Sequence, residues 1–209
     1  MSLAAMSSKN LLIVDNFLPD AAAYRDEVLK HPFHDVWFGG GIFTNIQVHS
    51  TNEFKKELEA VVQRPIEQAY SFLRANYKGE FPHNPIHNDD DIGGTAAILY
   101  LNPPEQCRGG TALWRHKPTG LERMPTPHEI KRHGKSPKRV MDAIYADGKD
   151  PDKWELVDMA DMKTNRLILY PAACFHSRYD PTAEEPFEGF GTTEFDVRLI
   201  WISFFKWKE

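Results

Sequence analysis

The sequence has few cysteines, and they lie far apart. Cys107 and Cys174 are the two cysteines among 209 residues. Two thiols in so large a chain do not provide the framework of a disulfide-stabilised domain, and no Cys-x-x-Cys pair is present. The composition therefore argues against a disulfide scaffold and against a zinc or redox site built from cysteines.

The sequence also lacks an excess of basic residues and long apolar runs. Its 25 Lys and Arg against 30 Asp and Glu give a formal net charge of -5, whereas a nucleic-acid-binding surface needs clustered basic residues. No run reaches the roughly 20 apolar residues of a membrane-spanning helix, and the first residues lack a signal-peptide pattern. We therefore expect a cytoplasmic protein without nucleic-acid or membrane partners, and this composition is compatible with an oligomer.

What the sequence does contain is enough apolar side chain for one large domain. Hydrophobic residues make up 41% of the chain and aromatic residues 12%, as in folded proteins with a sizeable core. The length fits one domain better than two, and we find neither an internal repeat nor a low-complexity linker. We therefore expect a single domain over residues 1–209.

Short strands and two helices are expected in residues 10–76. Three segments have the patterns of a strand, a helix and a strand in turn: 11–18, 19–30 and 42–48. A second helix is expected from Thr51 or Asn52 towards Leu73, with a break or kink at Pro65. We expect these helices to support the β-structure that follows.

Residues 77–205 have a different pattern, with short β-type runs separated by Gly- and Pro-containing turns. These runs are 95–102, 111–115, 166–170 and 197–205. Successive strands without alternating helices favour an antiparallel sandwich or barrel over a parallel α/β sheet. The polar segment 116–165, with a helix around 128–145, reads as an insertion. Because insertions near a barrel mouth often cover a site, we expect it to shape the substrate pocket together with segment 180–194.

One short motif is a candidate for metal binding. His87 and Asp89 are two positions apart, so on an extended backbone both side chains leave the same face. A distant histidine would complete the two-histidine, one-carboxylate set that binds iron(II) and leaves coordination positions open. Asp90 and Asp91 follow directly, and a run of acidic residues is usually a solvated loop. A His-x-Asp pair alone also arises by chance.

The His-x-Asp motif is the first of five elements that follow one another along the chain. After it come a strand ending in Tyr-Leu-Asn, a Gly-Gly turn, an apolar strand leading to a second histidine, and a terminal strand opening with arginine. Their positions are 87–89, 100–102, 109–110, 166–176 and 198–205. This order resembles the prolyl-hydroxylase-like branch of the iron(II)/2-oxoglutarate-dependent oxygenases. The resemblance covers about residues 80–205.

The resemblance implies a mainly β fold, a double-stranded β-helix (jelly-roll or cupin-like barrel) supported by N-terminal helices. It also implies iron(II), 2-oxoglutarate as co-substrate and O₂. Matched position by position, His87, Asp89 and His176 are the metal ligands and the catalytic centre. Arg198 matches the residue that holds the distal carboxylate of 2-oxoglutarate, and Tyr100 matches a hydroxyl that supports this carboxylate.

One departure from the family pattern concerns the distance along the chain between His176 and Arg198. These residues are 22 positions apart, more than in compact family members, and the intervening segment 180–194 reads as an inserted loop. Arg198 opens an otherwise apolar strand. Inside a barrel its charge would require a carboxylate partner, which its planar guanidinium suits.

The activity implied by the resemblance is that of a hydroxylase-type oxygenase. Such an enzyme couples oxidative decarboxylation of 2-oxoglutarate to C–H oxidation of a small-molecule or peptidyl substrate, while the protein orients the reactants. Two alternatives stand beside it. A cupin-type metal-dependent enzyme that does not use 2-oxoglutarate would not need Arg198, and a non-catalytic β-barrel binding module would need neither metal nor arginine.

Overall fold

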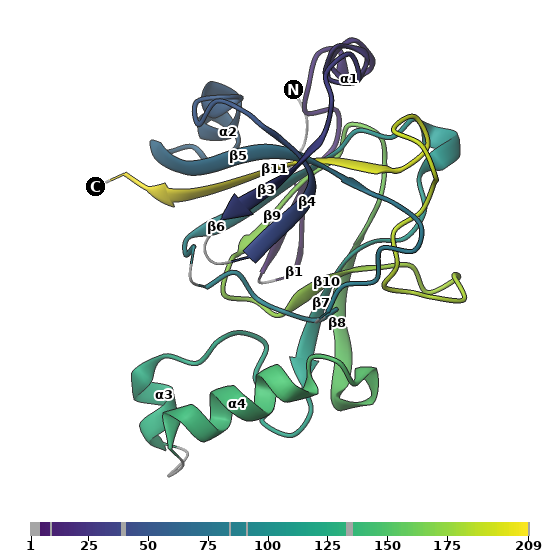
Figure 1. Ribbon diagram of the computed structural model, residues 1–209. Coiled ribbons are helices and arrows are strands. Elements are labelled where there is room, and N and C mark those ends of the chain that lie inside the picture. The colour runs from purple at the N-terminus through teal and green to yellow at the C-terminus, as the bar shows by residue number, and fades with distance from the viewer. Residues whose placement is uncertain are drawn as a thin grey trace.

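Two antiparallel sheets make up most of the fold of the computed structural model, which describes residues 5–8, 10–38, 41–83, 85–90, 92–132 and 136–208 (Figure 1). Within these ranges the larger sheet has eight strands, in the order β1 (Ala5–Ser8), β2 (Leu11–Val14), β9 (Leu167–Pro171), β6 (Thr95–Tyr100), β11 (Arg198–Trp207), β5 (Ile66–Asn76), β4 (Gly41–Val48) and β3 (His34–Phe38). The smaller sheet has three strands, in the order β10 (His176–Tyr179), β7 (Gly110–His116) and β8 (Trp154–Asp161). The chain is therefore mainly β, as the sequence predicts.

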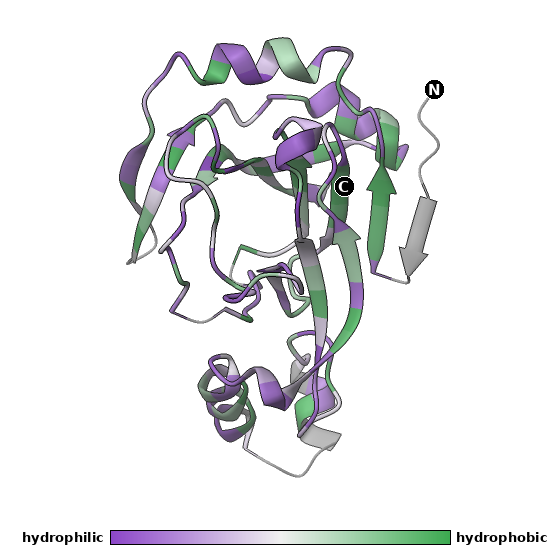
Figure 2. Cartoon of the chain, turned by 90° about the vertical axis from the view of Figure 1, so that its right-hand side faces the viewer, coloured by the Kyte–Doolittle hydropathy of each residue, from purple (hydrophilic) through white to green (hydrophobic). Residues whose placement is uncertain are grey.

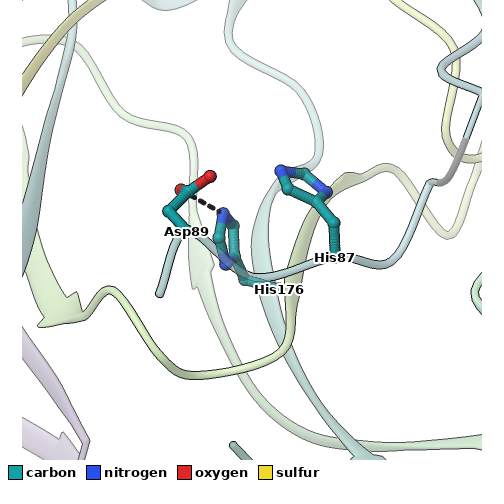
Figure 3. A group of neighbouring side chains, drawn as sticks. All are labelled: His87, Asp89 and His176. Atoms are coloured by element: carbon teal, nitrogen blue, oxygen red, sulfur yellow. Dashed lines mark ion pairs between the residues drawn. The ribbon is translucent and has the colours of Figure 1, made fainter. Parts of the chain in front are cut away.

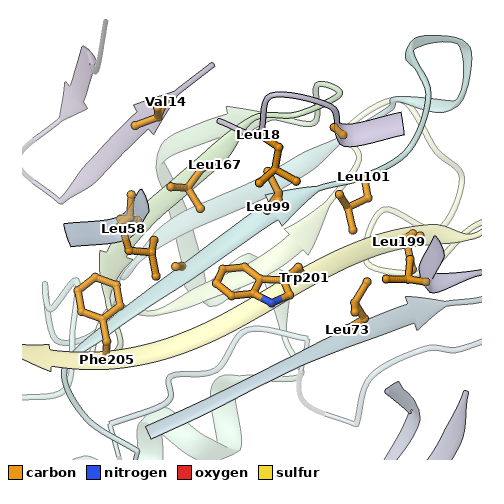
Figure 4. Close-up of a cluster of buried hydrophobic side chains, with 14 of the residues drawn as sticks. Val14, Leu18, Leu58, Leu73, Leu99, Leu101, Leu167, Leu199, Trp201 and Phe205 are labelled. Carbon is orange, nitrogen blue, oxygen red and sulfur yellow. The ribbon is translucent and has the colours of Figure 1, made fainter. Parts of the chain in front are cut away.

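Helices α1 (Ala21–Val28) and α2 (Lys55–Val62) cover the outer face of the larger sheet (Figures 1 and 4). Alternate residues of β11 divide between its two faces: Leu199, Trp201 and Phe205 pack on the helix side, whereas Ile200 and Phe204 face the smaller sheet. The outer face is thus a continuous apolar core, which leaves the inner face free to carry functional side chains.

The inner faces of the two sheets pack together through a second apolar cluster. Ile200 of β11 and Ile98 of β6 belong to it, as do Leu113 of β7 and Ala160 of β8. A backbone pairing of His87 with His176 adds a short extended segment beside β10, at the edge of the smaller sheet. Two facing antiparallel sheets of this topology form the predicted double-stranded β-helix.

The second predicted helix is wrong beyond Val62. Helix α2 ends at Val62, followed by Gln63 in the left-handed conformation at φ 54°. Pro65 has no backbone N–H to continue a helix. The chain from Ile66 to Asn76 is instead strand β5, whose whole length pairs with β11. The barrel therefore begins before residue 77.

The predicted insertion 116–165 is also corrected, because its last part is strand β8, which pairs with β7 from Gly110 to His116. Two helices, α3 (Pro127–Arg132) and α4 (Pro137–Asp147), replace the single expected helix. Both lie beyond the ends of β7 and β8, away from the larger sheet (Figures 1 and 2). Helix α4 contributes Val140 and Ile144 to an apolar cluster on the outer side of the smaller sheet, which also includes Trp114 and Phe175.

Because α4 is part of this cluster, we expect it to contribute to global stability. Ile144 of α4 is 3% exposed and its neighbour Tyr145 is 47% exposed. The Ile144→Ala variant should lower the free energy of unfolding by roughly 2–5 kcal/mol because it leaves a cavity. The control Tyr145→Ala should change it by less than about 0.5 kcal/mol. Urea denaturation of both variants measures this, and equal stabilities would show that α4 is not packed as described.

Two further expectations concern the cysteines and the membrane. Cys107 and Cys174 are both free, and Cys174 is buried. Among the helices of the described ranges, none has both the length and the hydropathy needed to cross a membrane.

Candidate metal centre

The structure brings His87, Asp89 and His176 together. His87 and Asp89 lie in the segment that precedes β6, and His176 is the first residue of β10. One ligand atom from each side chain lies within 4.8 Å of those from the other two, and the three side chains converge (Figure 3). The backbone pairing of His87 with His176 thus brings the candidate ligands of the two segments together.

Backbone hydrogen bonds hold the two ligand-bearing segments. The His87 N–H donates to the His176 carbonyl at 3.1 Å, and the His176 N–H donates back to the His87 carbonyl at 2.8 Å. The Asp89 N–H donates to the Ala172 carbonyl at 2.8 Å. The positions of the ligands are thus fixed by main-chain bonds across the sheet edge.

The orientation of both imidazole rings is set by their Nδ1 atoms. Nδ1 of His176 lies 2.9 Å from the Cys174 carbonyl oxygen, and Nδ1 of His87 lies 3.3 Å from the Pro85 carbonyl oxygen. A carbonyl can only accept, so each Nδ1 carries a proton. Nε2 of His87 is then left with a lone pair, whereas Nε2 of His176 donates to Asp89 when it is protonated and can bind a metal once it loses that proton. Nε2 of His176 is 3.2 Å from Oδ2 of Asp89. Carbonyl partners of this kind are typical of metal-ligating histidines.

The pKa values of two of these groups favour their ligand forms. Removal of His87 from bulk water, and then the charge of His176, lower the pKa of His87 to about 4, although one edge of the ring stays accessible from the cavity. Burial alone would raise the pKa of Asp89, but the charge and hydrogen bond of His176 outweigh it and lower this pKa. Near neutral pH, His87 is therefore neutral and Asp89 is ionised, as metal ligation requires.

A cavity of about 540 Å³ opens beside the three ligands and is lined by residues of both sheets. Its apolar walls come mainly from β4, β5 and β11. No described residue between Thr111 and Tyr170, or between Arg178 and Arg198, lines it. The expectation that segments 116–165 and 180–194 shape this pocket is therefore wrong: Ile144 and Phe187, one from each, are instead buried in the cluster on the outer side of the smaller sheet.

Arg198 lies in this cavity at the start of β11 and is only 5% exposed. Its Nη1 donates to Oδ1 of Asn76 at 3.0 Å, and its Nη2 donates to the Thr111 hydroxyl at 3.5 Å. Its buried Nε has no hydrogen-bond partner among the described residues, and burial lowers the pKa of the guanidinium. A buried cation with unused donors is suited to an anionic ligand.

Tyr100 lies beside Arg198 but does not line the cavity within the described part of the chain. Its ring centroid is 5.6 Å from the guanidinium carbon of Arg198, and its hydroxyl donates to Thr111 at 2.7 Å. Burial raises the pKa of Tyr100. The Thr111 hydroxyl therefore accepts hydrogen bonds from both Tyr100 and Arg198, the two side chains that the sequence assigns to 2-oxoglutarate binding.

Several cavity residues were not predicted. Thr111 follows the Gly-Gly turn, for which the sequence predicts only a turn. Asn76 and Arg74 lie on β5, most of which the sequence predicts as a helix. Tyr170 is the last residue but one of the apolar strand β9, and its ring centroid is 4.9 Å from that of His176. The polar end of an apolar strand was the signal available for Tyr170.

The fold and its three convergent ligands define a double-stranded β-helix protein with a candidate metal centre. Residues 80–185 match the model of the "Family of unknown function (DUF6445)", which is just over half of the chain. The chain belongs to this family. No curated protein sequence matches it.

Solved structures share the fold over 94% of this chain. The "non-heme alpha ketoglutarate dependent carbocyclase SnoK from nogalamycin biosynthesis" has a TM-score of 0.52 and 11% identity, with 79% of its own chain covered. AviO1 from Streptomyces viridochromogenes Tue57 has a TM-score of 0.51 and 12% identity, with 89% covered. HygX from Streptomyces hygroscopicus, with nickel and 2-oxoglutarate bound, has a TM-score of 0.50 and 13% identity, with 82% covered.

Proposed function

We propose that this protein is a non-haem, iron(II)- and 2-oxoglutarate-dependent oxygenase of the hydroxylase type. One observation carries the proposal: a single cavity holds both the His87, Asp89 and His176 cluster and the buried, incompletely hydrogen-bonded guanidinium of Arg198. Two imidazoles and one carboxylate fit iron(II), and the buried cation fits the distal carboxylate of 2-oxoglutarate. The ligands in the HygX structure and the description of SnoK support this class.

The roles of the side chains follow from their positions. His87, Asp89 and His176 would hold the metal, and a set of three protein ligands would leave coordination positions open for the co-substrate and O₂. When bound, iron(II) with 2-oxoglutarate and O₂ supplies C–H oxidation coupled to release of succinate and CO₂.

Asn76 orients the guanidinium of Arg198, which would hold the distal carboxylate together with the Thr111 hydroxyl. Tyr100 would act on this carboxylate through Thr111. The apolar inner walls exclude water from the site.

Finer assignments are part of the same proposal. We place the chain in the prolyl-hydroxylase-like branch because of the order of its five sequence elements, and residues 1–209 then form one oxygenase domain. The substrate would be a small molecule or a peptide that enters the cavity between the two sheets.

The proposal is tested by measuring succinate formation from 2-oxoglutarate by the purified protein. Formation should require added iron(II) and O₂, and it should continue slowly without a primary substrate. It should be lost in His176→Ala and retained in the control His83→Ala, whose exposed imidazole lies outside the cavity. An iron-loaded protein that neither binds nor decarboxylates 2-oxoglutarate would identify instead a metal-dependent enzyme that does not use this co-substrate.

A further inference from the structure

The cavity carries more positive charge than the proposed co-substrate requires. Its charged walls, within the described residues and apart from histidine, are Arg74, Arg178 and Arg198 against the single carboxylate of Asp89. This contrasts with the net charge of -5 of the whole chain. The question is therefore what each of the three guanidinium groups binds.

Each guanidinium nitrogen of Arg178 has a hydrogen-bond partner within the protein. Its Nε donates to the Phe187 carbonyl at 2.5 Å, and its two Nη atoms donate to the carbonyl and the carboxylate of Glu80. These bonds tie strand β10 to the segment after β5 and to the 180–194 loop. Arg178 therefore has a structural role, and Arg198 is assigned to 2-oxoglutarate under the proposed function.

Arg74 has unused hydrogen-bonding capacity. It lies on β5, paired with Ile46 of β4 and Ile200 of β11, and its side chain is 31% exposed. Its nearest anionic contact is an ion pair of 3.6 Å from Nη2 to Oε1 of Glu80, and its buried Nε has no hydrogen-bond partner in the described structure. A guanidinium that is partly removed from water and loosely paired favours an additional anion.

Glu80 cannot satisfy Arg74 alone because its carboxylate is shared. Oε1 accepts a hydrogen bond from the Thr44 hydroxyl at 2.5 Å, and Oε2 accepts from the Asn76 amide at 3.1 Å as well as from Arg178. A divalent metal and dianionic 2-oxoglutarate would cancel each other's charge. The three arginines then exceed Asp89 and Glu80 by one positive charge, which matches one monoanionic group on a further ligand.

Arg74 shares its cavity with the metal centre and with an apolar wall. Arg74 and the three candidate ligands line the same cavity, so a ligand bound to Arg74 would lie in the space that the metal centre faces. Beyond Arg74 along the sheet, the cavity wall is apolar: Phe72 of β5, Val48 of β4, and Ile202 and Phe204 of β11. A ligand held by Arg74 would therefore meet hydrocarbon on that side.

We infer that Arg74 binds the carboxylate of the primary substrate, and that this substrate is a monocarboxylic acid with an apolar body that packs against the β4–β5–β11 wall. The inference rests on the proposed function because it assigns Arg198 to 2-oxoglutarate. Arg74 is then a specificity-determining residue, which selects the substrate by a charge-assisted hydrogen bond and leaves an apolar part beside the metal centre.

The test is calorimetric titration, without O₂, of protein loaded with iron(II) and 2-oxoglutarate. The probes are octanoate and 3-phenylpropionate, each compared with its primary amide of nearly the same shape. Wild-type protein should bind the acids more tightly than the amides. Arg74→Gln should lower the affinity for the acids by roughly 10- to 100-fold and leave that for the amides unchanged. Arg74→Lys should recover part of the loss, because it keeps the charge.

The controls separate this inference from the proposed function. Arg64→Gln removes one positive charge from an exposed residue outside the cavity and should bind the acids like wild type. The inference is overturned if wild type binds acids and amides equally or binds neither, or if Arg74→Gln retains the acid preference. It is also overturned if Arg74→Gln loses 2-oxoglutarate itself. The protein could also fail to bind 2-oxoglutarate but still prefer acids in a way that depends on Arg74. That result would support the carboxylate site at Arg74 and refute the oxygenase assignment.

Discussion

The Arg198→Ala variant is expected to bind iron(II) like wild type and to lose most of its affinity for 2-oxoglutarate. The distal carboxylate must leave water to enter the cavity, and the guanidinium that would offset this is almost fully buried. Removing one partner of a buried ion pair costs about 3–5 kcal/mol, or roughly a few hundred- to several thousand-fold in affinity. Arg198→Lys should recover part of the lost affinity, because lysine keeps the positive charge but cannot form the bidentate hydrogen bonds of a guanidinium.

Anaerobic titration of 2-oxoglutarate into iron-loaded protein measures this effect through the visible charge-transfer absorption of the complex. Arg64→Ala is the matched control, since Arg64 is exposed and its guanidinium lies over the ring of Trp207, outside the cavity. Wild-type affinity in Arg198→Ala would mean that another residue anchors 2-oxoglutarate or that the protein does not bind it.

The Asp89→Ala variant is expected to lose most of its iron(II) binding. Asp89 supplies the one carboxylate of the cluster, and its removal also leaves Nε2 of His176 without its partner at 3.2 Å. Loss of an outer partner of a metal ligand typically lowers affinity by about 10- to 100-fold, so loss of the ligand itself should exceed about 100-fold. Metal analysis after dialysis against iron(II) without O₂ measures the bound amount.

Asp90→Ala is the matched control for Asp89→Ala. Asp90 is an exposed neighbour that is not part of the cluster, so its removal should leave iron binding unchanged. Asp91 lies outside the described residues, and its lack of a role in iron binding stays a prediction from the sequence. Strong loss of iron in Asp90→Ala with retention in Asp89→Ala would shift the assignment of the ligand by one residue.

The main strands of the double-stranded β-helix were predictable from the sequence because their apolar runs are bounded by Gly and Pro. Strands β6, β7, β9 and β11 begin and end within two residues of the predicted segments. Strand β8 is absent from the prediction because its apolar residues do not alternate regularly with its three acidic residues, as they would in a half-buried strand. Its formation depends on pairing with β7, which local sequence does not encode.

The site was predictable to a smaller extent than the fold. The two-residue spacing of His87 and Asp89 indicates a shared direction, but their meeting with His176 depends on a backbone pairing between distant segments. The sequence does not predict Arg74 because the expected helix extends past Pro65 towards Leu73, and a helix would not place alternate residues on one face. Recognising Ile66 to Asn76 as a strand would have placed Arg74 and Asn76 in the cavity wall.

The reciprocal hydrogen bonds between His87 and His176 have a consequence for how the protein takes up metal. They join two segments 89 residues apart using main-chain atoms alone, so the entropy of closing this loop is lost during folding and not during metal uptake. The protein should therefore act as a preorganised chelator, in contrast to small zinc domains that fold only around their ion. Metal could leave and return without unfolding the barrel, and added metal would raise thermal stability only by mass action.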